Sequence, residues 1–320
     1  MFERERGFRQ HLLTSDRETR AGIRFWLERV RSAYGPEPCV DMQVIEDQVL
    51  LNERSVRYLY GPYTPAKTVY RRGSRPFLEQ ILAAVVRPGM GEAKRFHAIL
   101  RLCRDNRDRA DPAIRFFGGN EEELIKRGAS MCNEISRVFV VLCQMAGLPA
   151  RLVSTHITGH MMAEARIGRD WAWCDPQKGL YLIRDDGRYA STWDLKRDPG
   201  ILDRQQPALW RECRPTPPRE DPAFAALHRA HYQAYVRDCC FHPREAVALG
   251  NYLIADHARY AYPWHTTVAD QRRLEAARTA ETTLRMRLGF PTCYFAAGAG
   301  LFEEMPLRMR RGPHVPPSRR

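Results

Sequence analysis

The sequence predicts an α+β fold in which one helix packs on an antiparallel sheet, with an additional helical region toward the C-terminus. Apolar residues over about 131–146 recur at the 3, 4, 7 spacing of an amphipathic helix, which Gly147 and Pro149 end. The runs ARLVST, HMMAEARI and WAWCDP then read as strands, with a turn at 168–170 before the last of them. After the Pro-rich stretch ECRPTPPREDP, helical patterns occupy about 221–238, 244–260 and 266–288.

The N-terminal part mixes both kinds of element. The first 35 residues follow a helical pattern, and residues 39–70 predict a strand pair that turns at Asn52-Glu53 and is closed by Gly61-Pro62. Two helices are expected over 76–87 and 92–104. We therefore predict a helix plus strand extension over 1–75, a core over 76–204 and an α-helical region with a basic tail over 205–320.

Length and composition indicate a folded protein. The chain has 320 residues, 44% of them hydrophobic, which is enough to build a sizeable core. It contains no apolar run long enough to cross a membrane, and MFERERGFRQ carries charge where a signal peptide would be apolar. We expect a cytoplasmic protein with no membrane partner. The nine cysteines are an odd number and are scattered, so most should be buried free thiols.

The basic charge does not predict a nucleic-acid protein. The formal net charge is +13, but phosphate binding needs a local cluster of basic side chains. In FERERGFRQ and RDNRDRADP the arginines alternate with acids, a pattern typical of solvated faces. Only the tail LRMRRGPHVPPSRR is basic and free of acids, and a disordered end explains it better than a nucleic-acid site.

Cys132 is the first candidate for chemistry. If Ser130 caps the helix, Cys132 lies in the first turn, where the helix dipole favours a thiolate. A buried core cysteine would fit the same position. His160 opens the following strand and Asp175 closes the strand after the turn, so a hairpin would bring imidazole and carboxylate to one end of a ribbon. Each of these two residues alone could equally be an ordinary strand histidine or a turn aspartate.

Four motifs in this order resemble the core of the transglutaminase-like superfamily, which has a papain-like cysteine fold. They are Cys132 opening a helix, the exit Gly147-Leu148-Pro149-Ala150-Arg151, a His160 followed four residues later by Glu164, and the closing Trp171-Ala172-Trp173-Cys174-Asp175-Pro176. The resemblance covers roughly residues 76–200. Ser130 stands where the family often has Gly, and Met161-Met162 stand where it often has an aromatic residue, which leaves the substrate class open.

The resemblance implies an enzyme without a cofactor. Cys132 would be the nucleophile, His160 the general base and acid, and Asp175 the residue that orients His160. The backbone N–H of Cys132 would stabilise the oxyanion, with Asn120 or Asn133 as a candidate second donor. Met161 and Trp173 are candidates to line the substrate site.

The expected reaction is acyl transfer from an amide or peptide bond through an acyl-thioester at Cys132. Hydrolysis is slightly favoured, because water needs no dedicated pocket. Transamidation to an amine acceptor uses the same three residues, and a catalytically inactive binding module with this fold is the further alternative.

Two cysteine-containing patterns resemble metal sites. Cys143, His156 and His160 imitate half of a zinc-finger pattern, but no cysteine lies two to four residues before Cys143. Cys239-Cys240-Phe241-His242 together with Cys213 could bind a metal, but adjacent cysteines at a helix end are explained more simply by packing. We expect no metal.

Overall fold

The computed structural model describes residues 48–53, 55–61, 70–110, 120–129, 131–155, 160–214, 230–243, 245 and 247–250. Its helices are α4 (Val56–Leu59), α5 (Pro76–Val85), α6 (Glu92–Asp108), α7 (Glu121–Arg127), α8 (Cys132–Met145), α9 (Thr192–Arg197) and α10 (Pro207–Glu212). Two short helices of other types are η2 (Pro199–Leu202), a 3-10 helix, and η3 (Val236–Cys240), a π-helix.

One antiparallel sheet crosses the molecule in the strand order β1-β6-β2-β3-β4-β5. The central hairpin pairs β3 with β4, so that Ala163 faces Cys174, and β2 pairs with β3 on its other side. The strands are β1 (Gln48–Leu50), β2 (Ala150–Thr155), β3 (Met161–Ile167), β4 (Asp170–Asp175), β5 (Leu180–Tyr181) and β6 (Val247–Gly250).

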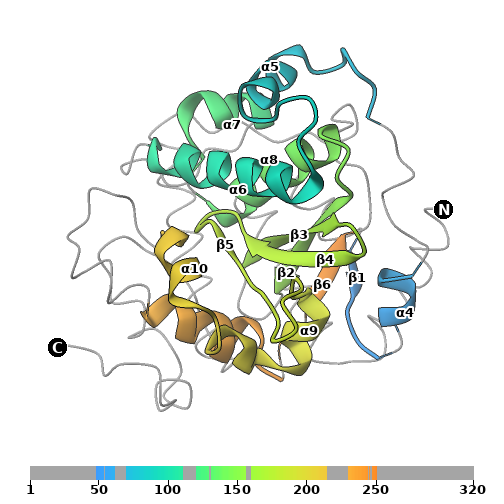
Figure 1. Ribbon diagram of the computed structural model, residues 1–320, viewed down its shortest axis with the longest axis vertical. Coiled ribbons are helices and arrows are strands. Elements are labelled where there is room, and N and C mark those ends of the chain that lie inside the picture. The colour runs from blue at the N-terminus through green and yellow to red at the C-terminus, as the bar shows by residue number, and fades with distance from the viewer. Residues whose placement is uncertain are drawn as a thin grey trace, which may run out of the picture.

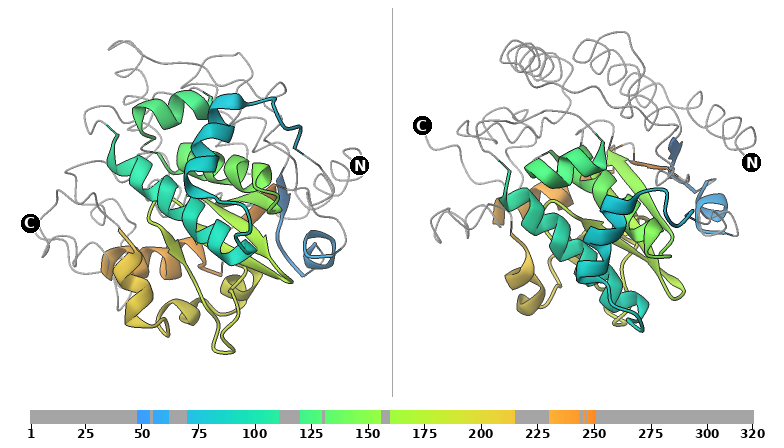
Figure 2. Two further views of the ribbon diagram at one scale, coloured as in Figure 1. Left: turned by 45° about the horizontal axis from the view of Figure 1, so that its top comes forward. Right: turned by 90° about the horizontal axis from the view of Figure 1, so that it is seen from above.

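Two cores cover the two faces of this sheet (Figures 1 and 2). The first core lies between the sheet and helices α5 to α8, and it takes Ala163, Ala172 and Cys174 from the strands. The second core lies on the opposite face, where α9, η2 and residues 232–241 pack against Met162 and Trp173. Side chains alternate between faces along a strand, so β2, β3 and β4 each contribute to both cores.

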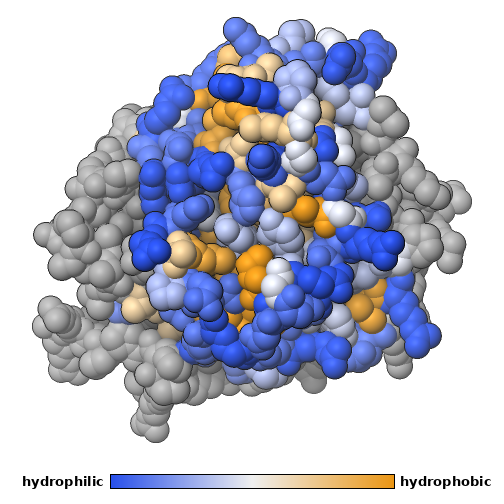
Figure 3. Space-filling model, in the orientation of Figure 1, coloured by the Kyte–Doolittle hydropathy of each residue, from blue (hydrophilic) through white to orange (hydrophobic). Residues whose placement is uncertain are grey.

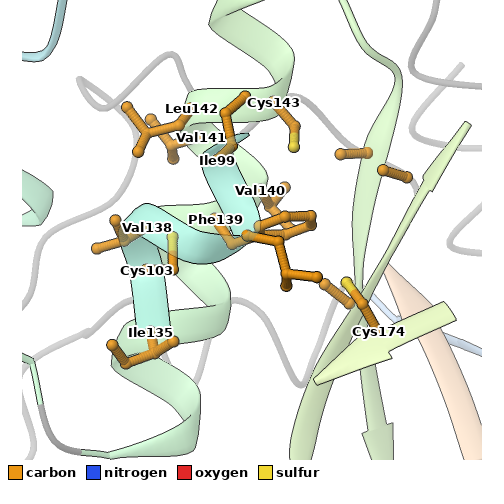
Figure 4. Packing of buried hydrophobic residues seen from close by; sticks show 14 of the residues in the cluster. Ile99, Cys103, Ile135, Val138, Phe139, Val140, Val141, Leu142, Cys143 and Cys174 are labelled. Carbon is orange, nitrogen blue, oxygen red and sulfur yellow. The ribbon is translucent and has the colours of Figure 1, made fainter. Parts of the chain in front are cut away.

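Helix α8 is the central element of the first core (Figure 4). Its residues from Glu134 to Gln144 are all buried, because α6 and α7 flank it and the sheet lies beneath. The helix ends at Gly147, whose positive φ of 76° a residue with a side chain would rarely adopt. There the N–H of Leu148 reaches back to the carbonyl of Cys143 at 2.9 Å, and the chain turns into β2.

The predicted α+β class is confirmed, and the three helices and three strands predicted between 76 and 176 lie where the sequence places them, whereas α7 was not predicted. The second strand of the predicted N-terminal pair is wrong, because α4 follows the turn instead. Asn52 and Ser55 exchange backbone-to-side-chain hydrogen bonds of 2.9 and 3.0 Å, an arrangement that starts a helix.

The predicted helix over 244–260 is also wrong where the structure describes it, because Val247–Gly250 form β6. This strand pairs with both β1 and β2, and all four of its residues are buried. A short apolar run that is buried on both faces lacks the alternation that identifies a strand. Residues 230–235 are helical as expected, whereas the helices predicted over 1–35 and 266–288 and the basic tail lie outside the described residues.

The prediction that RDNRDRADP forms a solvated face is wrong for three of its residues. Arg104, Asn106 and Arg107 are at most 6% exposed. Each donates to a backbone carbonyl of another segment: Arg104 to Glu212, Asn106 to Ile125 and Arg107 to Arg214. Elsewhere arginines do form exposed ion pairs, as Arg204 does with Asp185, and the face shown in Figure 3 is mostly hydrophilic, with hydrophobic residues in separate groups.

Candidate active site

Cys132 is the first residue of α8, with Met131 as the N-cap. Ser130, the expected cap, lies outside the described residues. The backbone N–H of Met131 instead donates to the carboxylate of Glu134 at 3.4 Å, and Glu134 is held by Arg127 at 2.9 Å. The thiol is half-buried and packs against the edge of the first core.

His160 lies directly before β3, and the backbone fixes its position. Its N–H donates to Thr155 Oγ1 at 2.9 Å and its carbonyl accepts the N–H of Thr155 at 2.9 Å, so the ends of β2 and β3 are tied together. The Oγ of Ser136 on α8 donates to the carbonyl of Met161 at 3.0 Å. This bond connects the helix that carries Cys132 to the start of the strand that follows His160.

Asp175 ends β4 and lies against His160. The antiparallel register places the end of β4 next to the start of β3, and His160 Nε2 lies 2.6 Å from Asp175 Oδ2. This contact leaves Nδ1 as the ring nitrogen available to Cys132. His160 is 4% exposed and Asp175 fully buried.

The environment favours the charged forms of this trio. Burial alone would raise the pKa of the Cys132 thiol, but the hydrogen bond and charge of His160 outweigh it, so that the pKa lies below its ordinary value. Burial would lower the pKa of His160, but the charge and hydrogen bond of Asp175, together with Cys132, raise it to about 9. A backbone hydrogen bond from Met161 also helps to lower the pKa of Cys132.

Asp175 accepts hydrogen bonds at both oxygens. Oδ1 accepts the backbone N–H groups of Gln177 at 2.9 Å and Lys178 at 3.3 Å, while Oδ2 accepts from His160 and from the hydroxyl of Tyr232. Burial would raise the pKa of Asp175, but His160, the charge of Lys178 and the Tyr232 hydrogen bond hold it below its ordinary value. Asp175 is therefore an anion at neutral pH despite its burial.

Sequence reasoning missed Tyr232, Tyr235 and Lys178. Tyr232 and Tyr235 come from the segment 230–241 on the second face of the sheet, and the ring of Tyr235 meets that of His160 edge-on with centroids 5.7 Å apart. Lys178 is 4% exposed, and burial lowers its pKa to about 8. Only the spacing of the two tyrosines along a helical pattern was visible in the sequence, and that spacing indicates core packing rather than a site.

The motif residues Arg151 and Glu164 form a fully buried ion pair away from the thiol, with Arg151 Nη2 and Glu164 Oε2 2.8 Å apart. The guanidinium lies between the rings of Tyr60 and Trp171. Tyr60 donates its hydroxyl to Glu164 at 2.6 Å, and Arg151 donates to the carbonyl of Leu59 at 2.6 Å. This pair therefore attaches the N-terminal segment around α4 to the sheet.

The four remaining predicted site residues differ in their surroundings. Met161 is 9% exposed and contacts the Cys132 thiol through its backbone, and Asn133 is half-buried next to Cys132 on α8. Asn120 is exposed and caps α7 by accepting the N–H of Glu123 at 3.0 Å, which does not support a role as oxyanion donor. Trp173 is fully buried in the second core against Phe241, which does not support contact with a substrate.

The other cysteines of the first core have a different environment. Cys103, Cys143 and Cys174 are fully buried, and burial raises the pKa of each thiol well above that of an ordinary cysteine. Cys143 and Cys174 lie between α8 and the sheet in Figure 4. Cys213 and Cys240 pack in the second core, and His156 lies outside the described residues. The described part of the chain contains no group of three or more His, Cys, Asp or Glu that could hold a metal ion.

Comparison with known proteins finds a similarity for the central region of the chain. Within the described ranges, no helix has the length and hydrophobicity needed to cross a membrane. Neither the curated proteins nor the solved structures include a match to this chain. A family model described as the transglutaminase-like superfamily matches residues 79–176, a range that begins in α5 and ends directly after Asp175. The resemblance seen in the four motifs is thereby confirmed: residues 79–176 are similar to the transglutaminase-like superfamily, a superfamily that generally includes cysteine-dependent enzymes.

Proposed function

We propose that the protein is a cysteine-dependent acyl-transfer enzyme that acts on an amide or peptide bond. The observation that carries this proposal is the 2.6 Å contact between His160 and Asp175 next to a half-buried thiol at the start of α8. Cys132 is the nucleophile, His160 the general acid and base, and Asp175 the residue that orients and stabilises the imidazolium.

The resting state of the proposed enzyme is a thiolate and imidazolium pair. The pKa of Cys132 lies below its ordinary value, whereas that of His160 is raised to about 9, so a proton shared by the pair is favoured on the imidazole rather than on the thiol. Cys132 Sγ then attacks the carbonyl carbon of the substrate, and the electrons of the C=O double bond move to oxygen. The backbone N–H of Cys132, in the first turn of α8, is directed at that oxyanion.

Collapse of this intermediate forms the acyl-thioester. The C=O bond re-forms, the C–N bond breaks and the imidazolium of His160 donates its proton to the leaving amine. Neutral His160 next removes a proton from water, whose oxygen attacks the thioester. The second intermediate expels the thiolate of Cys132, and the carboxylic acid product and the original ion pair remain.

The same residues also support transamidation, in which an amine replaces water in the second step. We favour hydrolysis, because water as the acceptor requires no dedicated binding site, whereas an amine acceptor does. Incubation with casein and a fluorescent primary amine separates the two reactions. Incorporation of the amine into casein indicates transamidation, whereas new free carboxylates without incorporation indicate hydrolysis.

Iodoacetamide labelling tests the nucleophile. At pH 6.5, Cys132 should be carbamidomethylated well before the buried cysteines, because only thiolates react and the buried thiols remain protonated. Mass spectrometry of tryptic peptides reports the order. Labelling of Cys132 no faster than that of the other cysteines would contradict the proposal and favour an inactive binding module.

Two alanine variants complete the test. Cys132→Ala should abolish turnover of every amide substrate that the wild type cleaves or transamidates. Cys143→Ala, on the same helix, is the matched control, because Cys143 is fully buried in the first core and should matter only for stability. The proposal also includes a cytoplasmic location and no nucleic-acid partner, which fractionation and an electrophoretic shift assay can check.

A further inference from the structure

We propose that Tyr232, from a segment outside the matched superfamily region, is a positioning residue that completes the active site by fixing the carboxylate of Asp175. The match ends at residue 176, directly after Asp175. Tyr232 lies in the segment 230–241, which packs in the second core on the sheet face opposite α8. This role rests on the proposed function of Cys132, His160 and Asp175.

The hydroxyl of Tyr232 donates to Asp175 Oδ2, the oxygen that also accepts from His160 Nε2. Tyr232 is 1% exposed, and burial, together with the charge of Asp175, raises its pKa well above the ordinary value. The phenol therefore stays protonated and is a permanent donor. Because Oδ1 is held by the backbone N–H groups of Gln177 and Lys178, Tyr232 is the side chain that holds the oxygen facing His160 from the other side.

The layers of the fold explain why this donor comes from a distant segment. Asp175 and Trp173 are two residues apart on β4, so their side chains point to the same face of the sheet, and the side chain of Trp173 is in the second core. The carboxylate therefore points toward the second face, whereas Cys132 approaches from the helices of the first face. The helix drawn in orange below the sheet in Figure 1 brings Tyr232 and Tyr235 to this face. The aromatic ring of Tyr235 limits movement of the His160 ring at an edge-on contact of 5.7 Å.

The charged groups around Asp175 come from several elements. They are His160 before β3, Lys178 after β4 and Arg107 at the end of α6, and the titratable thiols nearby are Cys132 beside Asp175 and Cys213 and Cys240 beside Tyr232. None of these is replaced when the Tyr232 hydroxyl is removed. A change in the titration of the site can therefore be assigned to the hydrogen bond.

Tyr232→Phe is the direct test, with the pH dependence of Cys132 alkylation by iodoacetamide as the measurement. Loss of the hydroxyl should loosen Asp175 and His160, so that the acid limb of the alkylation profile moves up by about one pH unit. The kcat for amide hydrolysis should fall about tenfold with little change in KM, because ground-state binding of the substrate is not altered.

Tyr60→Phe is the matched control. Tyr60 also donates to a buried carboxylate, that of Glu164, at 2.6 Å, but this pair lies outside the trio of Cys132, His160 and Asp175. The Tyr60→Phe variant should have a lower melting temperature but an unchanged pH profile of Cys132 alkylation. A Tyr232→Phe profile that stays unchanged, or that moves to lower pH, overturns the positioning role.

A second variant covers the case in which Tyr232→Phe does not fold. Incorporation of 3-fluorotyrosine at position 232 keeps the ring and hydroxyl but makes the phenol a stronger donor, so the acid limb should move to lower pH. An unchanged limb with this residue would overturn the proposal independently. The wild-type alkylation profile separates the proposed function from the role of Tyr232. If the wild-type acid limb lies at the ordinary pKa of cysteine, the proposed Cys132 thiolate is refuted. If the wild-type acid limb is low and both Tyr232 variants have the same limb, only the positioning role of Tyr232 is refuted.

Discussion

Replacing Glu164 by Gln should strongly destabilise the protein, although Glu164 lies in a motif that resembles a catalytic signature. Glu164 and Arg151 are both completely buried, and their charged atoms lie 2.8 Å apart. Glu164→Gln keeps the size of the side chain but leaves the guanidinium without its counter-charge in a site closed to water. Removing one partner of a buried pair costs about 3–5 kcal/mol of unfolding free energy. For a folded unit of this size the melting temperature should fall by about 6–20 °C.

The surroundings of the pair support the upper part of this range. Arg151 lies between two aromatic rings, 4.6 and 3.9 Å from their centroids, so it cannot turn toward solvent without breaking these contacts. Glu164 also accepts from the backbone N–H of Thr192 at 2.6 Å, and an amide that turns its NH₂ group toward that donor would lose this bond too.

Urea denaturation followed by tryptophan fluorescence gives the free energy, with Asp185→Asn as the control. Asp185 is also paired with an arginine, Arg204, at 3.0 Å, but both side chains are exposed, so this variant should lose less than about 1 kcal/mol. Adding Arg151→Met to Glu164→Gln should recover part of the loss, because no unpaired charge remains. A loss below about 1 kcal/mol for Glu164→Gln alone would refute the reasoning.

Three further predictions concern the site and its support. The rate of amide hydrolysis should depend on pH as a bell-shaped curve. It rises as the Cys132 thiolate forms below its ordinary pKa, and it falls near pH 9 because His160, whose pKa is raised to about 9, loses the proton that the leaving amine needs. A rate that continues to rise above that pH would contradict this assignment. Asp175→Asn should lower kcat/KM by about 10³- to 10⁴-fold, since it removes the charge that stabilises the imidazolium, and a loss below tenfold would exclude that role. Phe139→Ala should reduce the unfolding free energy by about 3–5 kcal/mol in urea, because Phe139 is fully buried against Phe96, whereas a small loss would mean that the cavity collapses.

The elements that are predictable from sequence are those whose burial is one-sided or whose ends carry clear signals. Helix α8 combines a continuous apolar stripe with Gly147 at its end, and the β3–β4 hairpin turns at Gly168, so both lie where the pattern places them. The candidate site residues Cys132, His160 and Asp175 could be chosen from the sequence because they lie at the ends of these two elements. Their proximity required only the helix, the hairpin and the antiparallel register.

The parts that sequence could not predict depend on long-range contacts. Val247–Gly250 is a strand because β1 and β2 offer it partners on both sides, and four apolar residues alone do not distinguish this from a helix. Arg104 and Arg107 are buried because other segments present carbonyl groups to them. Tyr232 reaches Asp175 from a helix whose sequence indicates only packing.

The position of β6 within the sheet also affects the order in which the chain can fold. During synthesis, β1 emerges first, but the strand it pairs with, β6, emerges after all the other described strands. Until then β2 has an open edge on that side, with unpaired backbone groups that can bind another chain. Nascent chains of this protein should therefore depend on chaperones until residue 250 has left the ribosome, and fragments that end before residue 247 should aggregate rather than fold.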